Sequence, residues 1–362
     1  MSAHEILIAV MAAFAALGAL DRIFGNRIGL GPEFENGILS LGSLALSMVG
    51  IISLAPVLAK VLRPVVVPVY RFLGADPAMF AGTILANDMG GASLARELAG
   101  SVQAAQLGGL LVGAMLGATV VFSIPVALGI LKPEDRPALA KGILAGIVTI
   151  PLGVLAGGLT AGFPVGMVLR NLIPIVLIAV LIALGLWKAE NGMIKGFAVF
   201  GKIIVGIVTL GLGAAIVEAL TGLVLIPGMA PITDGMEIVA DIAIVLAGAF
   251  PLVWVITKLF RKPLMKLGSL LGMNDTAAAG LIASLANSIA MFGMVKDMDR
   301  RGKVINVAFA VSAAFVFGDH LGFTAGFDPG MLVPVIVGKL VGGVTAVLAA
   351  MLLTKGERHD KR

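Results

Sequence analysis

The stretch PAMFAGTILANDMGGASLARELA, residues 77–99, decides how the fold of this chain is interpreted. It is long and apolar enough to cross a bilayer, yet Asn87, Asp88 and two glycines interrupt it near the centre. An aspartate in the middle of a spanning helix costs about 2.5–3.5 kcal/mol, and Asn-Asp followed by Gly-Gly favours a turn. The segment therefore predicts a helical hairpin that enters the membrane and returns to the same side, since such backbone is tolerated where protein or a cavity surrounds it.

The composition of the whole chain is that of an integral membrane protein. Of its 362 residues, 59% are hydrophobic and 13% are charged, whereas a soluble domain carries about 25% charged residues. No polar stretch is long enough for a soluble domain, which excludes a soluble enzyme on a membrane anchor. The chain has no cysteine and three histidines, so no disulfide, metal site or other cofactor is expected. The net charge of +5 indicates basic cytoplasmic loops rather than nucleic-acid binding.

The two halves of the chain resemble each other at an offset of about 198 residues, which is typical of a duplicated unit. LGAD at 73–76 recurs as LGMN at 271–274, and GIVT at 146–149 recurs as GGVT at 342–345. Such matches keep their order and nearly constant spacing along the chain. Duplication is a common plan of secondary transporters.

Each unit is predicted to contain five apolar segments. We expect a first membrane repeat at 1–165, a connecting helix at 166–190, a second repeat at 191–354 and a short polar tail at 355–362. The apolar segments lie at 4–24, 36–60, 77–99, 104–131 and 138–162 in the first repeat, at 168–187 in the connector, and at 200–222, 236–258, 276–297, 303–325 and 331–354 in the second. The predicted fold is therefore all-α, with about nine to eleven transmembrane segments.

The distribution of lysine and arginine favours a hairpin in each repeat. If all eleven segments span, these residues divide 13 to 12 between the two sides, leaving out Lys339 because it lies inside a segment. If 77–99 and 276–297 re-enter instead, 20 gather on one side and 5 on the other. Cytoplasmic loops carry the excess of positive charge. The second arrangement obeys this rule, makes the two repeats inverted and places the C-terminus in the cytoplasm.

The polar residues inside the third segments are the first candidates for function, because ionisable side chains in a membrane are costly. Asn87 and Asp88 lie at one predicted hairpin tip, and Asn287 and Ser288 occupy the matching place in the second repeat. Helix ends and a carboxylate near the midplane suit a small cation with hydrogen-bonding groups. The alternative is structural: Asp88 caps a half-helix, and Asn287 with Ser288 satisfies a helix break.

A second group of candidates follows the uncharged run at 304–317. Asp319 beside His320 is suited to binding a cation or relaying a proton, and Phe317, like its equivalent Phe122, offers a ring face to an ammonium group. The alternatives are a wet helix end near the outer surface for the Asp–His pair and ordinary packing for the rings. Common catalytic motifs are absent from the sequence, so no enzyme is predicted.

Five strings along the chain are long enough to suggest a family. They are MFAGT at 79–83, DMGG at 88–91, VFSIPVALG at 121–129, RGKVIN at 301–306 and GDHLGF at 318–323. They resemble the ethanolamine permease family of bacterial ethanolamine-utilisation operons, and the similarity covers nearly the whole chain. The resemblance implies uptake of ethanolamine across the bacterial inner membrane by a secondary carrier or facilitator. A channel-like pore for neutral amine or ammonia and a membrane enzyme acting on lipid head groups are the alternatives.

The resemblance also implies what the binding site has to supply. Ethanolamine is a primary amine and is mostly cationic at neutral pH, like a lysine side chain. Its site needs a carboxylate for the ammonium group and amide or hydroxyl partners for the alcohol. Ethanolamine and the lipid bilayer are the expected partners, and a homo-oligomer is compatible with these features. The candidate substrate-binding residues are Asn87, Asp88, Asn287, Ser288, Phe317, Asp319 and His320.

Overall fold

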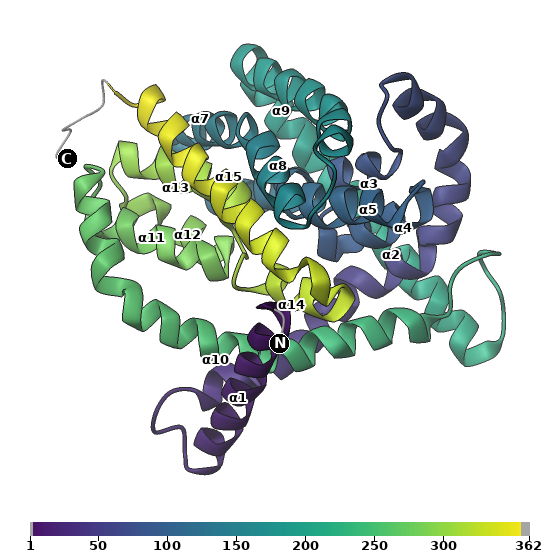
Figure 1. The fold of residues 1–362 in the computed structure, drawn as a ribbon, viewed down its shortest axis with the longest axis horizontal. Coiled ribbons are helices and arrows are strands. Elements are labelled where there is room, and N and C mark those ends of the chain that lie inside the picture. The colour runs from purple at the N-terminus through teal and green to yellow at the C-terminus, as the bar shows by residue number, and fades with distance from the viewer. Residues whose placement is uncertain (1–2, 356–362) are drawn as a thin grey trace.

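Helices make up all the regular structure in the part of the chain that the computed structural model describes, residues 3–355 (Figure 1). The predicted polar tail at 355–362 lies outside the described residues, except for Lys355. Long apolar runs form helices because a backbone in lipid has to satisfy its own polar groups within the segment. The helices are α1 (Ala3–Ile23), α2 (Gly31–Phe72), α3 (Ala78–Ile84), η1 (Asn87–Gly91), α4 (Ala92–Leu98), α5 (Val102–Ala105), η2 (Gln106–Gly117), η3 (Thr119–Ser123), α6 (Ile124–Ile130), η4 (Pro133–Asp135), α7 (Arg136–Ile147), α8 (Ile150–Thr160), α9 (Val165–Thr221), α10 (Ile232–Leu270), α11 (Asp275–Ala286), α12 (Ser288–Met294), η5 (Val295–Asp297), α13 (Arg300–Ala313), α14 (Asp319–Phe327), η6 (Pro329–Met331) and α15 (Leu332–Leu353).

Within the described residues, eight helices are long and apolar enough to cross a membrane, so the chain is a multi-pass membrane protein. Nine to eleven crossings were expected from the sequence. The predicted segment at 303–325 is not among the eight, because the chain breaks after Ala313 into α13, with 14 residues, and α14, with 9. The eight helices cover His4–Ile23, Gly31–Phe72, Val102–Ile130, Pro133–Thr160, Val165–Ala189, Asn191–Thr221, Ile232–Leu259 and Pro329–Leu353.

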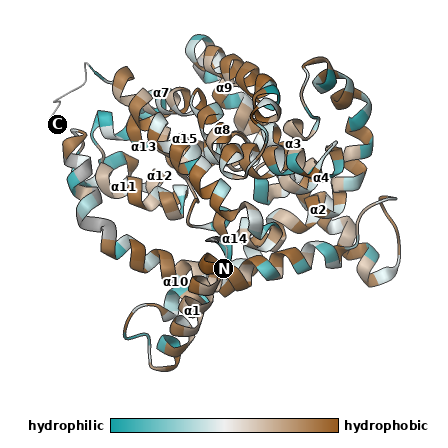
Figure 2. Ribbon diagram, in the orientation of Figure 1, coloured by the Kyte–Doolittle hydropathy of each residue, from teal (hydrophilic) through white to brown (hydrophobic). Residues whose placement is uncertain are grey.

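Helices from the two halves of the chain pack on one another. The long helices α2 and α10 contact each other, α15 packs on α7 and α8, and α13 packs on α7 (Figure 1). Hydrophobic residues are spread along the length of these helices (Figure 2). Large side chains such as Leu181, Leu210 and Leu220 are exposed, as suits helices that contact lipid.

Both predicted hairpin segments are broken in the middle. In the first, α3 ends at Ile84 and the two residues before Asn87 are extended, with φ/ψ of −127°/141° and −63°/151°. In the second, Asn287 is extended (−156°/124°) between α11 and α12. The two short helices of each segment contact each other. An extended residue interrupts the i to i−4 hydrogen bonds, so each segment consists of two short helices rather than one spanning helix.

Glycine in η2 permits the first broken segment to lie close against the long helix behind it. A Cβ atom on Gly117 would lie 1.9 Å from the carbonyl oxygen of Leu85, in the extended residues of the break. Small residues at helix contacts in membranes let backbones approach in this way. The break is therefore held by backbone packing as well as by its own sequence.

Candidate functional site

A cavity of about 320 Å³ lies where the two broken segments meet the break between α13 and α14. It brings together four of the seven predicted site residues, namely Asp88, Asn287, Asp319 and His320. These come from η1, the residue before α12, and the first turn of α14. The lining residues are Ser43, Leu44, Ser47, Ala86, Asp88, Met89, Ala118, Phe122, Asn287, Ile289, Phe315, Asp319 and His320.

The loop between α13 and α14 is held in place by main-chain hydrogen bonds to the end of α11. The N–H of Phe315 donates to the carbonyl of Ser284 at 3.0 Å, and the N–H of Phe317 donates to the carbonyl of Leu285 at 2.9 Å. The last carbonyls of a helix lack partners within the helix, so this strand-like pairing satisfies them. It also sets the start of α14, and thus Asp319 and His320, against the second broken segment.

Two residues of this loop show how tightly it is built. A Cβ atom on Gly318 would lie 2.1 Å from the carbonyl oxygen of Ala286, so the position accepts only glycine. Phe315 has a φ of +63°, in the left-handed region that non-glycine residues rarely adopt. Such conformations persist where the surrounding structure holds them, and they cluster at functional sites.

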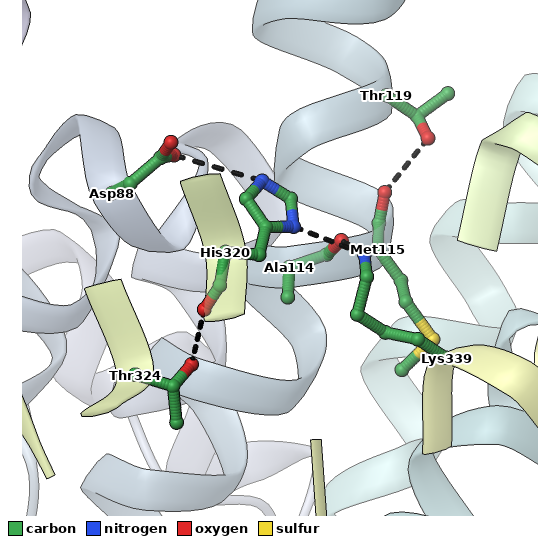
Figure 3. A network of polar contacts seen from close by, with 7 residues as sticks. All are labelled: Asp88, Ala114, Met115, Thr119, His320, Thr324 and Lys339. Atoms are coloured by element: carbon green, nitrogen blue, oxygen red, sulfur yellow. Dashed lines mark hydrogen bonds and ion pairs between the residues drawn. The ribbon is translucent and has the colours of Figure 1, made fainter. Parts of the chain in front are cut away.

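Three ionisable side chains form a line from the cavity into the protein interior (Figure 3). The Nε2 atom of His320 lies 3.8 Å from Oδ1 of Asp88, and its Nδ1 atom lies 3.0 Å from Nζ of Lys339. Lys339 also donates a hydrogen bond of 2.6 Å to the carbonyl of Ala114 in η2. The side chains of His320 and Asp88 are 3% and 16% exposed. The predicted alternative of a wet helix end therefore does not describe His320, which is buried.

Aromatic rings cover one side of this line. The rings of Phe122 and Phe315 meet edge to face with centroids 5.6 Å apart, and the ring of Phe315 lies 5.2 Å from that of His320. Phe317, the predicted aromatic residue, is not in the cavity lining, and Phe315 stands there instead. The left-handed conformation at Phe315 changes the direction of the chain between these two positions.

Asn87 and Ser288 lie beside the cavity rather than in its lining. Both are fully buried, and within the described part of the chain neither polar atom of the Asn87 amide nor the hydroxyl of Ser288 has a hydrogen-bond partner. Asn287 uses its side-chain oxygen to accept a hydrogen bond of 2.7 Å from the N–H of Ile289. This contact caps α12, as the structural alternative predicted, while the residue also faces the cavity.

Sequence reasoning did not name Lys339 as a site residue. It lies in α15 and is 1% exposed. The signal was present in the sequence, because a charged residue inside an apolar segment is a functional candidate by the rule that singled out Asp88. Phe315 carried no such signal, because a left-handed phenylalanine cannot be read from the residue type.

The charges of the site leave room for a monovalent cation. Asp88 and Asp319 supply two negative charges when ionised, and Lys339 supplies one positive charge, so with neutral His320 the group is one positive charge short. Buried charges are stable only when they are paired. The residues that the structure describes contain no cluster of three or more His, Cys, Asp or Glu that would hold a metal ion. A small organic cation fits both the charge and the hydrogen-bonding groups of the cavity.

Membrane-length helices around a polar cavity, with broken helices at its edge, are the features of a multi-pass membrane protein, and they fit the transporter class. Comparison with known proteins identifies the group within that class. The chain belongs to the EutH family, described as "Ethanolamine utilisation protein, EutH", which matches residues 3–353. The family resemblance predicted from the sequence is therefore confirmed.

Curated relatives are similar over nearly their full length. "Probable ethanolamine permease EutH" of Listeria monocytogenes serotype 1/2a (strain 10403S) is 63% identical over 353 residues, covering 98% of this chain and 95% of that protein. A protein of the same name from Escherichia coli (strain K12) is 51% identical over 395 residues, covering 99% and 97%. "Uncharacterized protein YxeR" of Bacillus subtilis (strain 168) is 51% identical over 364 residues, covering 100% and 98%. No solved structure matches the chain.

Proposed function

We propose that this protein takes up protonated ethanolamine across the bacterial inner membrane, as a secondary carrier or facilitator. The observation that carries the proposal is the pair of carboxylates, Asp88 and Asp319, in a small cavity among membrane-length helices. Relatives at 51% and 63% identity are named ethanolamine permeases. Ethanolamine carries a positive charge at neutral pH, and a cation crosses lipid poorly without a protein.

The cavity offers a partner for each part of this substrate. The ammonium group pairs with Asp88 and Asp319, and the rings of Phe122 and Phe315 supply aromatic surface beside it. The alcohol group binds the amide of Asn287, which faces the cavity while its oxygen caps α12. Of the other predicted site residues, Asn87 and Ser288 act from the shell around the cavity, and Phe317 acts through its main-chain contact with α11.

We further propose that the chain is built from two inverted repeats, at 1–165 and 191–354, joined by the connecting helix at 166–190. The bend of α9 at Ala189 supports this boundary, and the breaks in both third segments support re-entrant hairpins. The ninth crossing is then the broken pair α13 and α14. The excess of basic residues on one side favours a cytoplasmic C-terminus.

Cysteine labelling tests this topology, and the natural absence of cysteine removes any background. Ser101, between the first broken segment and α5, and Lys296, after the second, are both exposed. A cysteine in place of Ser101 is expected to react with a membrane-impermeant maleimide on intact cells. A cysteine in place of Lys296 is expected to react only after the membrane is permeabilised. Reaction of both positions from the same side would contradict the inverted arrangement.

Uptake of labelled ethanolamine into proteoliposomes tests the proposed function. We expect saturable uptake, with and without a pH gradient, and exchange of labelled for unlabelled ethanolamine across the membrane. A channel-like pore for neutral amine or ammonia predicts the opposite: flux that does not saturate, rises with pH and shows no exchange. Empty liposomes at the same pH values give the leak of neutral amine that has to be subtracted.

A further inference from the structure

Lys339 has no role in the proposed binding of ethanolamine, yet it occupies the interior of the protein beside the site. It is 1% exposed in the apolar helix α15. Its Nζ atom contacts the carbonyl of Ala114 and Nδ1 of His320, and no carboxylate within the described residues forms an ion pair with it directly. An isolated buried charge is costly. A lysine at this place is therefore stable either as a neutral amine or through a carboxylate that His320 connects to it.

The hydrogen bonds around His320 are compatible with two proton arrangements. If Lys339 is an ammonium ion, it is a donor only, so Nδ1 of His320 accepts and the imidazole proton lies on Nε2, facing Asp88. If Lys339 is a neutral amine, its lone pair accepts from a proton on Nδ1, while an N–H still donates to Ala114. Both arrangements retain the hydrogen bonds of Lys339 to His320 and to Ala114. They differ in the charge of Lys339 and in which ring nitrogen of His320 carries the proton.

We infer that Asp88, His320 and Lys339 form a proton relay that removes the charges of Asp88 and Lys339 when the binding site is empty and restores them when the substrate cation binds. This inference rests on the proposed function. As the substrate leaves, an N–H bond of Lys339 breaks and Nδ1–H of His320 forms, while Nε2–H of His320 breaks and an O–H bond forms on Asp88. The products are a neutral amine, the other neutral imidazole tautomer and a carboxylic acid. Binding of the substrate reverses both transfers, and no proton enters or leaves the protein.

The geometry suits this transfer in two respects. The His320–Lys339 contact of 3.0 Å is a hydrogen bond, and the 3.8 Å between His320 and Asp88 needs to shorten by about 1 Å to become one. Catalytic and transport contacts are often long before the substrate binds. Asp319 is the other titratable residue in the cavity lining, and it directly precedes His320 in the chain. Within the described residues it forms no ion pair with His320 or Lys339, and its negative charge opposes that of an ionised Asp88.

The relay has a definite consequence for the transport cycle. An empty site that holds the separated charges of Asp88 and Lys339 in addition to that of Asp319 is costlier to reorient in the membrane than one that holds the charge of Asp319 alone. Net uptake requires the empty site to return, but exchange of internal for external ethanolamine requires only the loaded site to move. A protein with a blocked relay is therefore expected to exchange substrate while failing in net uptake.

The test compares two variants of Lys339 in the full-length protein in proteoliposomes. Arginine does not give up its proton, so Lys339→Arg should retain exchange of labelled ethanolamine and lose net uptake by at least about tenfold, equivalent to about 1.4 kcal/mol. Lys339→Met removes the proton acceptor, so the proton of Asp88 has to go to water when the cation binds. Its affinity for ethanolamine should then rise by up to about tenfold per pH unit, whereas wild-type affinity should not change between about pH 6 and about pH 8.

Calorimetric titration of wild type and Lys339→Met with ethanolamine, in phosphate and in MOPS buffer, counts the protons released on binding. We expect none for wild type and one for Lys339→Met. Thermal unfolding of each purified variant separates loss of fold from loss of relay, and Lys339→Met tests the inference even if the larger arginine does not fit. The relay would be contradicted if wild type released a proton on binding, or if both Lys339 variants showed the net uptake of wild type. Either result would leave the proposed transport of ethanolamine intact. A wild-type protein that shows no exchange would overturn the carrier as well.

Discussion

Replacing Asp88 with asparagine is expected to have the largest effect of any single substitution on ethanolamine binding. Asp88→Asn keeps the size of the side chain but removes the negative charge that faces the cavity. Loss of one partner from a buried charge pair costs about 2–5 kcal/mol, which corresponds to a reduction in affinity of about 30-fold to about 5,000-fold. Uptake at substrate concentrations below the wild-type KM should fall by the same factor.

Two other aspartates provide the comparison. Asp319→Asn should weaken binding by a smaller factor, because that residue lines the cavity but, within the described residues, forms no ion pair with His320 as Asp88 does. Asp297→Asn, at the exposed end of the short helix η5 after the second broken segment, should leave binding and uptake unchanged. Equilibrium binding of labelled ethanolamine to purified protein measures all three. If Asp88→Asn and Asp319→Asn both transport like wild type, the cavity is not the binding site.

Gly318→Ala is expected to have the largest effect on the fold around the site. The new methyl group would lie 2.1 Å from the carbonyl oxygen of Ala286. The backbone on both sides of this contact is hydrogen-bonded, since the N–H of Gly318 donates to Phe315 and the N–H of Asn287 donates to Ala283. Either the loop or the end of α11 has to shift, with loss of hydrogen bonds worth about 1–3 kcal/mol each when left unpaired. We expect a clear loss of thermal stability and of ethanolamine binding.

Gly129→Ala is the matched control for this substitution. Gly129 is in α6, and a Cβ atom there meets nothing within 4 Å. Alanine is a better helix former than glycine by about 1 kcal/mol, so this variant should unfold at the wild-type temperature or slightly above it. A Gly318→Ala protein with wild-type stability and wild-type binding would show that the loop can move away without consequence.

The sequence was sufficient to predict the helical membrane fold and the breaks in the two third segments. In lipid, a long apolar run has few alternatives to a helix. The polar residues and glycines at 87–91 favour a turn by their residue types alone. The glycines at 318 and 322 allow a broken helix within 303–325, but the position of the break after Ala313 was not predicted, because nothing in the apolar run before Gly318 opposes a continuous helix. It depends on a partner far away in the sequence: the loop that starts at Ala314 exchanges helical hydrogen bonds for bonds to Ser284 and Leu285.

Ionisable site residues could be predicted from the sequence, because their residue type is unusual in a membrane segment. Aromatic site residues could not, because their role depends on where the backbone places them. Asp88, Asp319 and His320 stand out in an apolar chain, and the structure brings them to one cavity. The choice of Phe317 followed from its equivalence to Phe122. Because Phe315 has a left-handed backbone conformation, the ring that lies against His320 is that of Phe315 and not that of Phe317.

The strand-like pairing between the α13–α14 loop and the end of α11 also limits how the cavity can be reached. The main chain of Phe315 and Phe317 is bonded to that of Ser284 and Leu285, so the second broken segment and the loop next to it form one mechanical unit. Separating the loop from α11 would leave the N–H groups of Phe315 and Phe317 without their hydrogen-bond acceptors. A motion that widens the cavity is therefore expected to move the second broken segment and this loop together, as one rigid body.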